Sequence, residues 1–314
     1  MPLRTLFEKS LNCQPDEHIG LIYDAAFSPI ASSIIDYCSE RDMKLDSHRF
    51  EYDGTSPLPE DIRLLFLERT PEVLIVALLS NIWHTPERWS AKHELGKRIA
   101  NIIHPSEPCS SYLADISRMS RIGRPLEQLL LESTEIHITS PAGTDLTARI
   151  GKVFCETGDY RAPGSGGDFP AGEVGFGPQE GSVNGRLVYD FKVQHLGRVK
   201  DYPVVLMVKD DVVVTDFARR DFLPLLQRHD ILRFVSEISI GINDVWTEVD
   251  EDSSIVEEKN FGTVHFGHGS NLSYGTRRGP HFDAVILNPS IVVDNRCIMS
   301  DGVFNEKYIK FDRS

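Results

Sequence analysis

The segment His281-Phe-Asp283 has the residue types and the spacing of a metal-binding strand. On an extended chain, residues i and i+2 point their side chains to the same face. An imidazole nitrogen and a carboxylate oxygen placed in this way can share one metal ion. His281 and Asp283 are therefore the first predicted ligands of a divalent-metal site.

Two more histidines precede this segment, in the stretch from Gly262 to Asn271. His265 lies where apolar and polar residues alternate, as they do along a strand with one buried face. His268 lies in the turn that we expect at the end of that strand. We predict that His265 is a metal ligand and that His268 faces the solvent.

Two carboxylates, Glu173 and Glu237, stand at positions of predicted strands where apolar residues would be expected. A charged group among apolar neighbours must be paired or must coordinate a cation, because an unpaired charge is expensive to desolvate. We therefore add both glutamates to the predicted metal ligands.

These residues belong to four segments whose order along the chain matches that of a known superfamily. The segments are Phe169-Pro-Ala-Gly-Glu-Val174 with Gly181-Ser-Val-Asn-Gly185, Ser236-Glu-Ile-Ser-Ile-Gly-Ile-Asn243, the stretch 262–271, and His281-Phe-Asp-Ala-Val-Ile-Leu-Asn-Pro-Ser290. On them, residues 143–304 resemble the thermophilic-type metallo-aminopeptidase superfamily, which also includes the 2,5-dihydroxypyridine 5,6-dioxygenases. The resemblance implies a pair of divalent ions, bridged by Glu173 or Asp283 and held by Glu173, Glu237, His265, His281 and Asp283.

Within this superfamily we predict an aminopeptidase-like hydrolase that acts on a short peptide or an amino-acid amide. A pair of Zn, Co or Mn ions would lower the pKa of a bound water, polarise the peptide carbonyl and bind the free amine of the substrate. Glu173 is the predicted catalytic carboxylate. The aminopeptidases carry a tyrosine seven residues after the first histidine, to stabilise the oxyanion. Leu272 stands there in this chain, and Tyr274, two residues further on, is the predicted catalytic tyrosine.

Two alternatives stay open. A ring-cleaving dioxygenase would hold a single Fe(II) in a triad of histidine and carboxylate ligands, which leaves positions free for substrate and oxygen. That branch of the superfamily carries a histidine at the position of Glu237. The other alternative is a peptide-binding protein of a natural-product pathway that has kept the cleft and lost turnover. The missing tyrosine fits such a protein, whereas the complete set of metal ligands does not.

Five other polar residues have both a structural and a functional interpretation. His84 is expected to orient loops at a strand-to-helix turn rather than to take part in chemistry. Glu156 and Asp159 are expected to be surface-loop carboxylates, unless their loop lines a cleft. Arg277 and Arg278 either meet a substrate carboxylate or cap a turn.

The elements that must position the site change in character along the chain. From residue 18 to residue 103, short apolar runs alternate with segments of helical periodicity, which predicts a parallel α/β layer. Thr85 and Pro86 have the residue types of an N-cap and a first helical position. Residues 106–133 are predicted to be mostly helical, with a break at Gly123 and Pro125.

From Glu135 onward, short strands and Gly-rich turns predominate. We predict a Rossmann-like α/β domain over residues 1–134, followed by a β-rich α+β metal-binding domain over residues 135–314. Within the second domain, Leu223 to Phe234 are predicted to form a helix. The acidic run 248–258 lacks the spacing of a calcium loop and is predicted to be a solvated loop followed by a short helix.

The composition limits the partners and the location of the chain. A formal net charge of −14 would repel a phosphate backbone, so we expect no nucleic-acid partner. The apolar run 73–79 is far shorter than a bilayer crossing, and the N-terminus lacks an apolar signal-peptide core. We therefore expect a cytoplasmic protein without a membrane partner. The five cysteines are scattered and predict neither disulfides nor a cysteine zinc site. A homodimer is expected from the family resemblance.

Overall fold

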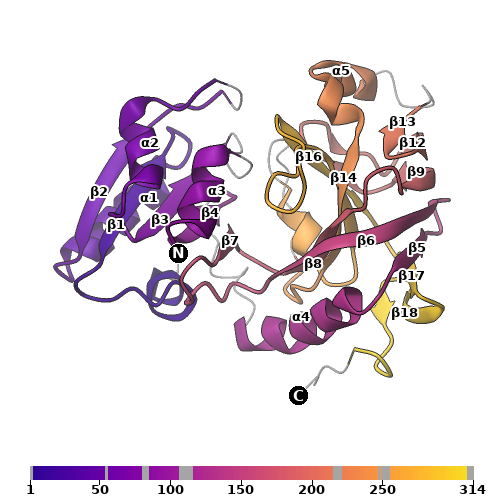
Figure 1. Ribbon diagram of the computed structural model, residues 1–314, viewed down its shortest axis with the longest axis horizontal. Helices are drawn as coiled ribbons and strands as arrows, with labels where there is room; N and C mark the ends of the chain where they lie inside the picture. The colour runs from indigo at the N-terminus through magenta and orange to yellow at the C-terminus, as the bar shows by residue number, and fades with distance from the viewer. Residues whose placement is uncertain are drawn as a thin grey trace. The chain divides into compact units, whose positions relative to one another are not determined.

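The computed structural model describes residues 3–53, 56–79, 85–105, 116–214, 221–246, 248 and 255–309. It confirms the predicted fold class, because a parallel α/β sheet is followed by a large antiparallel sheet (Figure 1). The chain forms two compact units, residues 1–116 with 158–171 and residues 117–157 with 172–314. The predicted division between residues 134 and 135 is linear. It assigns the helix at 116–131 to the first domain and the strand at 166–169 to the second, whereas the compact units have the reverse assignment.

The first unit contains a parallel sheet of five strands in the order β2-β1-β3-β4-β7. Its strands are β1 (His18–Tyr23), β2 (Lys44–Arg49), β3 (Val73–Ala77), β4 (Arg98–Ile102) and β7 (Gly166–Phe169). Every residue of the central strand β3 is buried, as expected for a parallel strand that is covered on both faces.

Helical segments cover both faces of this sheet. They are the π-helical turn η1 (Thr5–Ser10) and the helices α1 (Ser28–Ser39), α2 (Glu60–Leu67) and α3 (Pro86–His93). Ile75 of β3 packs with η1 and α1, whereas Leu74 and Val76, on the other face, pack with α2 and α3. The predicted start of α3 is confirmed, because the Thr85 side chain accepts a hydrogen bond from the backbone N–H of Arg88.

The second unit is built on a sheet of fourteen strands. Its main path has the order β11-β10-β16-β15-β14-β8-β6-β5-β17-β18-β19, and β9 leads from β6 to β12 and β13. The strands are β5 (Glu135–Thr139), β6 (Asp145–Glu156), β8 (Glu173–Pro178), β9 (Asn184–Tyr189), β10 (Lys192–Val193), β11 (Gly197–Arg198), β12 (Val204–Lys209), β13 (Val212–Val213), β14 (Val235–Gly241), β15 (Val264–Gly269), β16 (His281–Ile286), β17 (Ser290–Val293), β18 (Arg296–Ser300) and β19 (Val303–Phe304). All residues of β14 and β15 are buried, so any charged side chain on them must find partners inside the protein.

The helical segments of this unit differ from the prediction in two places. They are α4 (Ile116–Leu131), α5 (Phe222–Gln227) and the 3-10 turns η2 (Asp230–Arg233) and η3 (Val256–Lys259). The predicted break at Gly123 and Pro125 is wrong, since α4 runs through both residues. A Cβ atom at Gly123 would lie 2.9 Å from Ile242 Cδ1, so the glycine allows close packing of the helix. The single helix predicted from Leu223 is instead divided into α5 and η2.

None of the helices described has the length and the apolar character that a bilayer crossing requires.

Candidate metal centre

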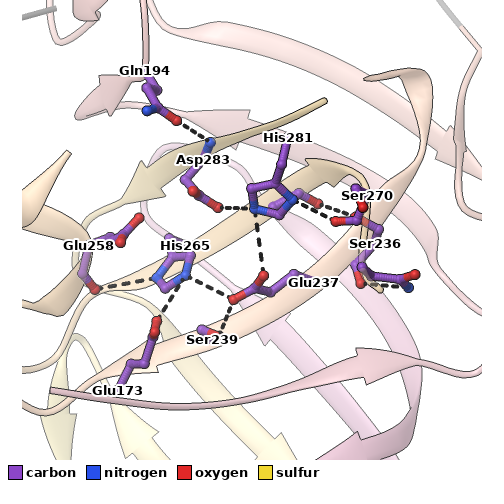
Figure 2. A network of polar contacts seen from close by, with 12 residues as sticks. Glu173, Gln194, Ser236, Glu237, Ser239, Glu258, His265, Ser270, His281 and Asp283 are labelled. Atoms are coloured by element: carbon purple, nitrogen blue, oxygen red, sulfur yellow. Dashed lines mark hydrogen bonds and ion pairs between the residues drawn. The ribbon is translucent and has the colours of Figure 1, made fainter. Parts of the chain in front are cut away.

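Neighbouring antiparallel strands bring the predicted ligands to one face of the sheet (Figure 2). Glu237 of β14 lies opposite Gly267 of β15, which in turn lies opposite Asp283 of β16. Directly opposed residues share a face, and so do residues two apart on one strand. His265 therefore projects from the same face as Glu237, and His281 projects from the same face as Asp283.

His281 lies between two carboxylates. Its Nε2 atom is 2.9 Å from Asp283 Oδ1 and 3.6 Å from Glu237 Oε2. Its Nδ1 atom is 2.7 Å from the backbone carbonyl of Ser270. A carbonyl can only accept, so Nδ1 carries the proton, and Nε2 of the neutral imidazole presents a lone pair that can bind a cation.

His265 has a similar arrangement on the neighbouring strand. Its Nε2 atom is 3.2 Å from Glu173 Oε2 and 3.4 Å from Glu237 Oε1, and its Nδ1 atom is 3.3 Å from the carbonyl of Glu258. Glu173 is the first residue of β8 and lies opposite Gly241, which places it at the end of the same face. Glu237 thus lies between the two histidines, with one oxygen toward each.

The carboxylates decide the protonation of these histidines. Burial lowers the pKa of His265, but the negative charges of Glu258, Glu237 and Glu173 outweigh burial and raise it to about 10. Burial likewise lowers the pKa of His281, and the neighbouring Asp283 and Glu237 raise it to about 9. Without a cation, both imidazoles therefore hold an extra proton at neutral pH, which a metal ion would displace.

The acidic groups respond in opposite directions. Burial raises the pKa of Glu173 to about 7, although Lys259 and His265 counteract this effect. Burial also disfavours the charged form of Asp283, but the adjacent His281 holds the pKa of this carboxyl well below its ordinary value. Asp283 is therefore ionised over the whole physiological range and is available as an anionic ligand.

The side chains fit a buried divalent metal. In each of three groups, one ligand atom per residue lies within 4.8 Å of the others: Glu237, His281 and Asp283; Glu173, Glu237 and His265; and Glu258, His265 and Asp283. In addition, the buried Oε2 atom of Glu173 accepts no hydrogen bond from the described residues, and its contact with His265 Nε2, at 3.2 Å, is an ion pair. The structure thus brings all five predicted ligands together, and the part that each of them plays remains a prediction.

The sequence analysis missed the contribution of η3. The acidic run was predicted to be a solvated loop followed by a short helix. A short 3-10 helix, η3, does end the run, but its acidic residues are not solvated, since Glu257 and Glu258 are 0 % and 4 % exposed. The Nζ atom of the buried Lys192 lies 3.0 and 3.2 Å from the two carboxylate oxygens of Glu257. The apolar residues Ile255 and Val256, which interrupt the acidic run, are the signal that could have revealed this burial.

Gly267 is a second residue that the sequence analysis missed. A Cβ atom at this position would lie 2.5 Å from His281 Cε1 and 2.8 Å from Glu237 Cβ. The absence of a side chain lets the His281 ring cross β15 toward Glu237. Gly267 therefore belongs to the site, although it offers no ligand atom.

Polar neighbours hold the ligands in orientation. The Ser239 hydroxyl donates to Glu237 Oε1 at 3.0 Å, and the backbone N–H of Asp283 donates to Gln194 Oε1 at 3.2 Å. Such supporting hydrogen bonds fix the direction of ligand lone pairs before a metal binds.

His268 is fully buried, so its predicted exposure is wrong. β15 extends through Gly269, and His268 therefore points into the face opposite to His265. Its Nε2 atom is 2.5 Å from the Tyr189 hydroxyl and its Nδ1 atom is 3.1 Å from the Leu232 carbonyl. Burial lowers the pKa of His268 to about 4.

Tyr274, the predicted catalytic tyrosine, stacks on Phe154 with ring centroids 4.7 Å apart. Leu272 is partly buried nearby in the chain. The role predicted for Tyr274 depended on peptide hydrolysis and has no other support.

The contacts of Arg277 favour a structural role over a contact with a substrate carboxylate. Its Nη2 atom lies 3.1 Å from the buried Asp211, and its guanidinium lies 4.5 Å from the centre of the Phe234 ring. Arg278 is exposed.

The remaining polar candidates are Glu156, Asp159 and His84. Glu156 was expected on a surface loop, which is wrong, because it is a buried residue of β6 opposite Glu173. Asp159 accepts two hydrogen bonds of 2.7 Å from Arg161. His84 lies outside the described residues.

Comparisons with known proteins place the chain in a family. The family model for NicX, 2,5-dihydroxypyridine 5,6-dioxygenase, matches residues 62–306. The fold is similar to that of 2,5-dihydroxypyridine dioxygenase from Pseudomonas putida KT2440, with a TM-score of 0.81, 17 % identity and 96 % of each chain covered. It is also similar to wild-type AmpT from Thermus thermophilus, with a TM-score of 0.61, 12 % identity, and 96 % of this chain and 97 % of that chain covered. A search of the curated proteins found no match.

These findings confirm the predicted superfamily and correct the predicted activity. The aminopeptidase-like hydrolase is wrong, because the family model that matches is that of the dioxygenases. The peptide-binding alternative is rejected for the same reason, because it assumed descent from an aminopeptidase. The resemblance found in the sequence covers both branches of the superfamily, so the predicted ligands alone did not separate them. The chain belongs to the 2,5-dihydroxypyridine 5,6-dioxygenase family.

Proposed function

We propose that this chain is a non-haem Fe(II) dioxygenase that opens the ring of a dihydroxylated pyridine. The observation that carries the proposal is the convergence of Glu237, His281 and Asp283, whose ligand atoms lie within 4.8 Å of one another. A triad of histidine and carboxylate ligands leaves positions open on Fe(II) for a substrate and for oxygen. Membership of the dioxygenase family supports the same chemistry.

Bound to this triad, Fe(II) would supply the redox chemistry that joins molecular oxygen to the ring. The protein contributes orientation. The Ser270 carbonyl holds the proton of His281 on Nδ1, so that Nε2 faces the metal, and the Ser239 hydroxyl fixes one oxygen of Glu237. Because Glu237 stands where the dioxygenase branch carries a histidine, this triad has one more negative charge than a triad with two histidines.

Burial contributes a second function, the exclusion of water. Glu237 and Asp283 are only 6 % and 9 % exposed, so charges in the site interact more strongly than they would in water.

The proposed reaction balances without a further reactant. As one carbon–carbon bond of the ring breaks, both atoms of the oxygen molecule enter the product. No external reductant is consumed.

The test is oxygen uptake by protein that has been loaded with Fe(II) under anaerobic conditions. Addition of 2,5-dihydroxypyridine and ¹⁸O₂ should consume oxygen and substrate in equal amounts, and mass spectrometry should find both labelled atoms in the ring-opened product. Asp283→Asn should abolish uptake, and His268→Gln, on the opposite face of the sheet, should retain it.

The substrate class can be separated from the reaction class with a panel of dihydroxylated benzenes. Uptake with a benzene diol and none with the pyridine would overturn the pyridine assignment and leave the ring-opening chemistry. No uptake with any dihydroxylated ring, in protein shown to contain iron, would overturn the proposal as a whole.

A further inference from the structure

A buried ammonium group lies beside the candidate metal centre. The Nζ atom of Lys259 is 2.6 Å from Glu173 Oε1 and 2.9 Å from Glu258 Oε1. Lys259 is only 3 % exposed, and Glu173 and Glu258 are each 4 % exposed. A lysine is almost never buried to this degree unless its charge is paired.

The position of Lys259 is fixed by its own segment. Lys259 is the last residue of η3, and the same turn carries Glu257. Glu257 forms its own buried ion pair with Lys192, through both carboxylate oxygens. This pair anchors η3 in the interior and delivers the Lys259 side chain to Glu173.

The contacts of Lys259 coincide with the ligands that a second metal ion would use. Of the three groups described above that include a histidine, the two that contain His265 require either Glu173 or Glu258. Both of these carboxylates already give an oxygen to the Lys259 ammonium. The group of Glu237, His281 and Asp283 contains neither of them.

We propose that the ammonium of Lys259 takes the place of a second cation, so that the centre binds one divalent ion, at Glu237, His281 and Asp283. A divalent ion beside His265 would have to share its carboxylates with a positive charge a few ångströms away, and like charges at that separation repel strongly in a buried site. Glu173 and His265 then act as positioning residues around the bound metal. The inference rests on the triad of the proposed function, not on the reaction assigned to it.

Removal of the ammonium should open the second position. In Lys259→Gln, the carboxylates of Glu173 and Glu258 lose their counter-charge, and with His265 they form an acidic pocket that suits a second divalent ion. Lys97→Gln is the control, because it also removes a buried lysine, 2 % exposed, whose Nζ atom donates to the backbone carbonyls of Leu65 and Pro71 in the first unit.

The experiment counts bound ions. Apo-protein is titrated with Mn(II), the bound metal is measured by elemental analysis, and the electron paramagnetic resonance spectrum distinguishes isolated ions from exchange-coupled pairs. We expect one isolated ion per chain in the wild type and in Lys97→Gln, and two ions with a coupled spectrum in Lys259→Gln. Two ions in the wild type, or a folded Lys259→Gln protein that still binds one, would overturn the proposal.

A second variant covers the case in which Lys259→Gln does not fold. Since Glu173 pairs with Lys259 and is not a ligand of the single ion, Glu173→Gln should still bind one ion, with an affinity reduced by no more than about 100-fold. A loss of more than about 100-fold would show that Glu173 is a ligand, against the proposal.

Failure of this inference and failure of the proposed function give different results. Two ions in a wild-type protein that opens the dihydroxylated ring would reject the role of Lys259 and leave the function. One ion in a protein that opens no ring would reject the function and leave the role of Lys259.

Discussion

The two faces of strand β15 carry the same residue type in opposite chemical states. His265 and His268 are three residues apart, and both are at most 1 % exposed. On the acidic face, which we define as Glu173, Glu237, His265, His281 and Asp283, the pKa of the histidine is raised to about 10. On the aromatic face, which we define as Tyr189, Phe222, Phe266, His268 and Phe282, the pKa of the histidine is lowered to about 4.

This difference shows that neither residue type nor burial makes a histidine a candidate ligand. Burial lowers the pKa of both rings, and only the surrounding carboxylates reverse the effect at His265. His268 instead stacks on Phe282, with an interplanar angle of 4°, and both of its nitrogens have neutral partners. The acidic face is built to receive a cation, whereas the aromatic face is built to keep a neutral ring.

The largest expected effect comes from a ligand on the acidic face. Asp283→Asn removes an anionic ligand and should lower metal affinity by more than about 100-fold, since even groups that only support a ligand contribute about 10- to 100-fold. Isothermal titration with Mn(II) measures the change. His268→Gln, on the aromatic face, should lose stability and keep its metal affinity. Equal losses of affinity in the two variants would abolish the distinction between the faces.

The next effect is a pH dependence that belongs to the aromatic face. The pKa of His268 is lower in the folded chain than its ordinary value of 6.5, so the unfolded chain binds the proton first as the pH falls. The stability due to the neutral ring is present above pH 6.5 and is lost as the pH drops toward 4. Between about pH 7 and about pH 5 we expect His268 to account for about 2 kcal/mol of lost unfolding free energy.

Urea unfolding of apo-protein at both pH values measures this loss. His268→Gln removes the titrating group, so its stability should fall by about 2 kcal/mol less than that of the wild type over the same interval. If the two proteins lose the same amount, His268 does not remain neutral in the folded state.

The smallest expected effect concerns the glycine between the strands of the acidic face. Gly267→Ala forces the His281 ring away from Glu237, because the new Cβ would lie 2.5 Å from Cε1 of the ring. We expect an affinity for Mn(II) about tenfold lower than that of the wild type, similar to the loss of one supporting group. Gly181→Ala is a control with nothing within 4 Å of its added Cβ. It should leave the affinity unchanged, and a Gly267→Ala protein with wild-type affinity would contradict the proposed path of the ring.

The fold class could be predicted from the sequence because it depends on local pattern. Apolar runs such as β3 mark a parallel sheet, and Thr85 with Pro86 marks the start of α3. Glu173 and Glu237 stood out because a carboxylate within a buried strand is costly without a partner. The other three predicted ligands, His265, His281 and Asp283, came from strand spacing and from the family resemblance, and the structure brings them close to the two glutamates.

The rest of the site depends on contacts between distant residues, which no local pattern records. Glu257 lies at the end of an acidic run of the kind that usually faces water, and Lys259 follows it. Their burial depends on Lys192 and Glu173, which are far away in the sequence. Gly267 gains its role from a ring on the next strand. The activity was mispredicted for a related reason. The residue types of the ligands are compatible with both a hydrolase and a dioxygenase, and they do not determine the number of bound ions.

The return of the chain to its first unit limits how the protein can be divided. β7 comes after α4, β5 and β6 in the sequence, yet it completes the parallel sheet by pairing with β4. A fragment that stops at residue 134 would leave the hydrogen-bonding groups on that side of β4 uncovered, which invites pairing with other chains. Any fragment intended to isolate the parallel sheet must therefore be supplemented with residues 158–171, for example through a short graft after β4 or as a peptide added in trans.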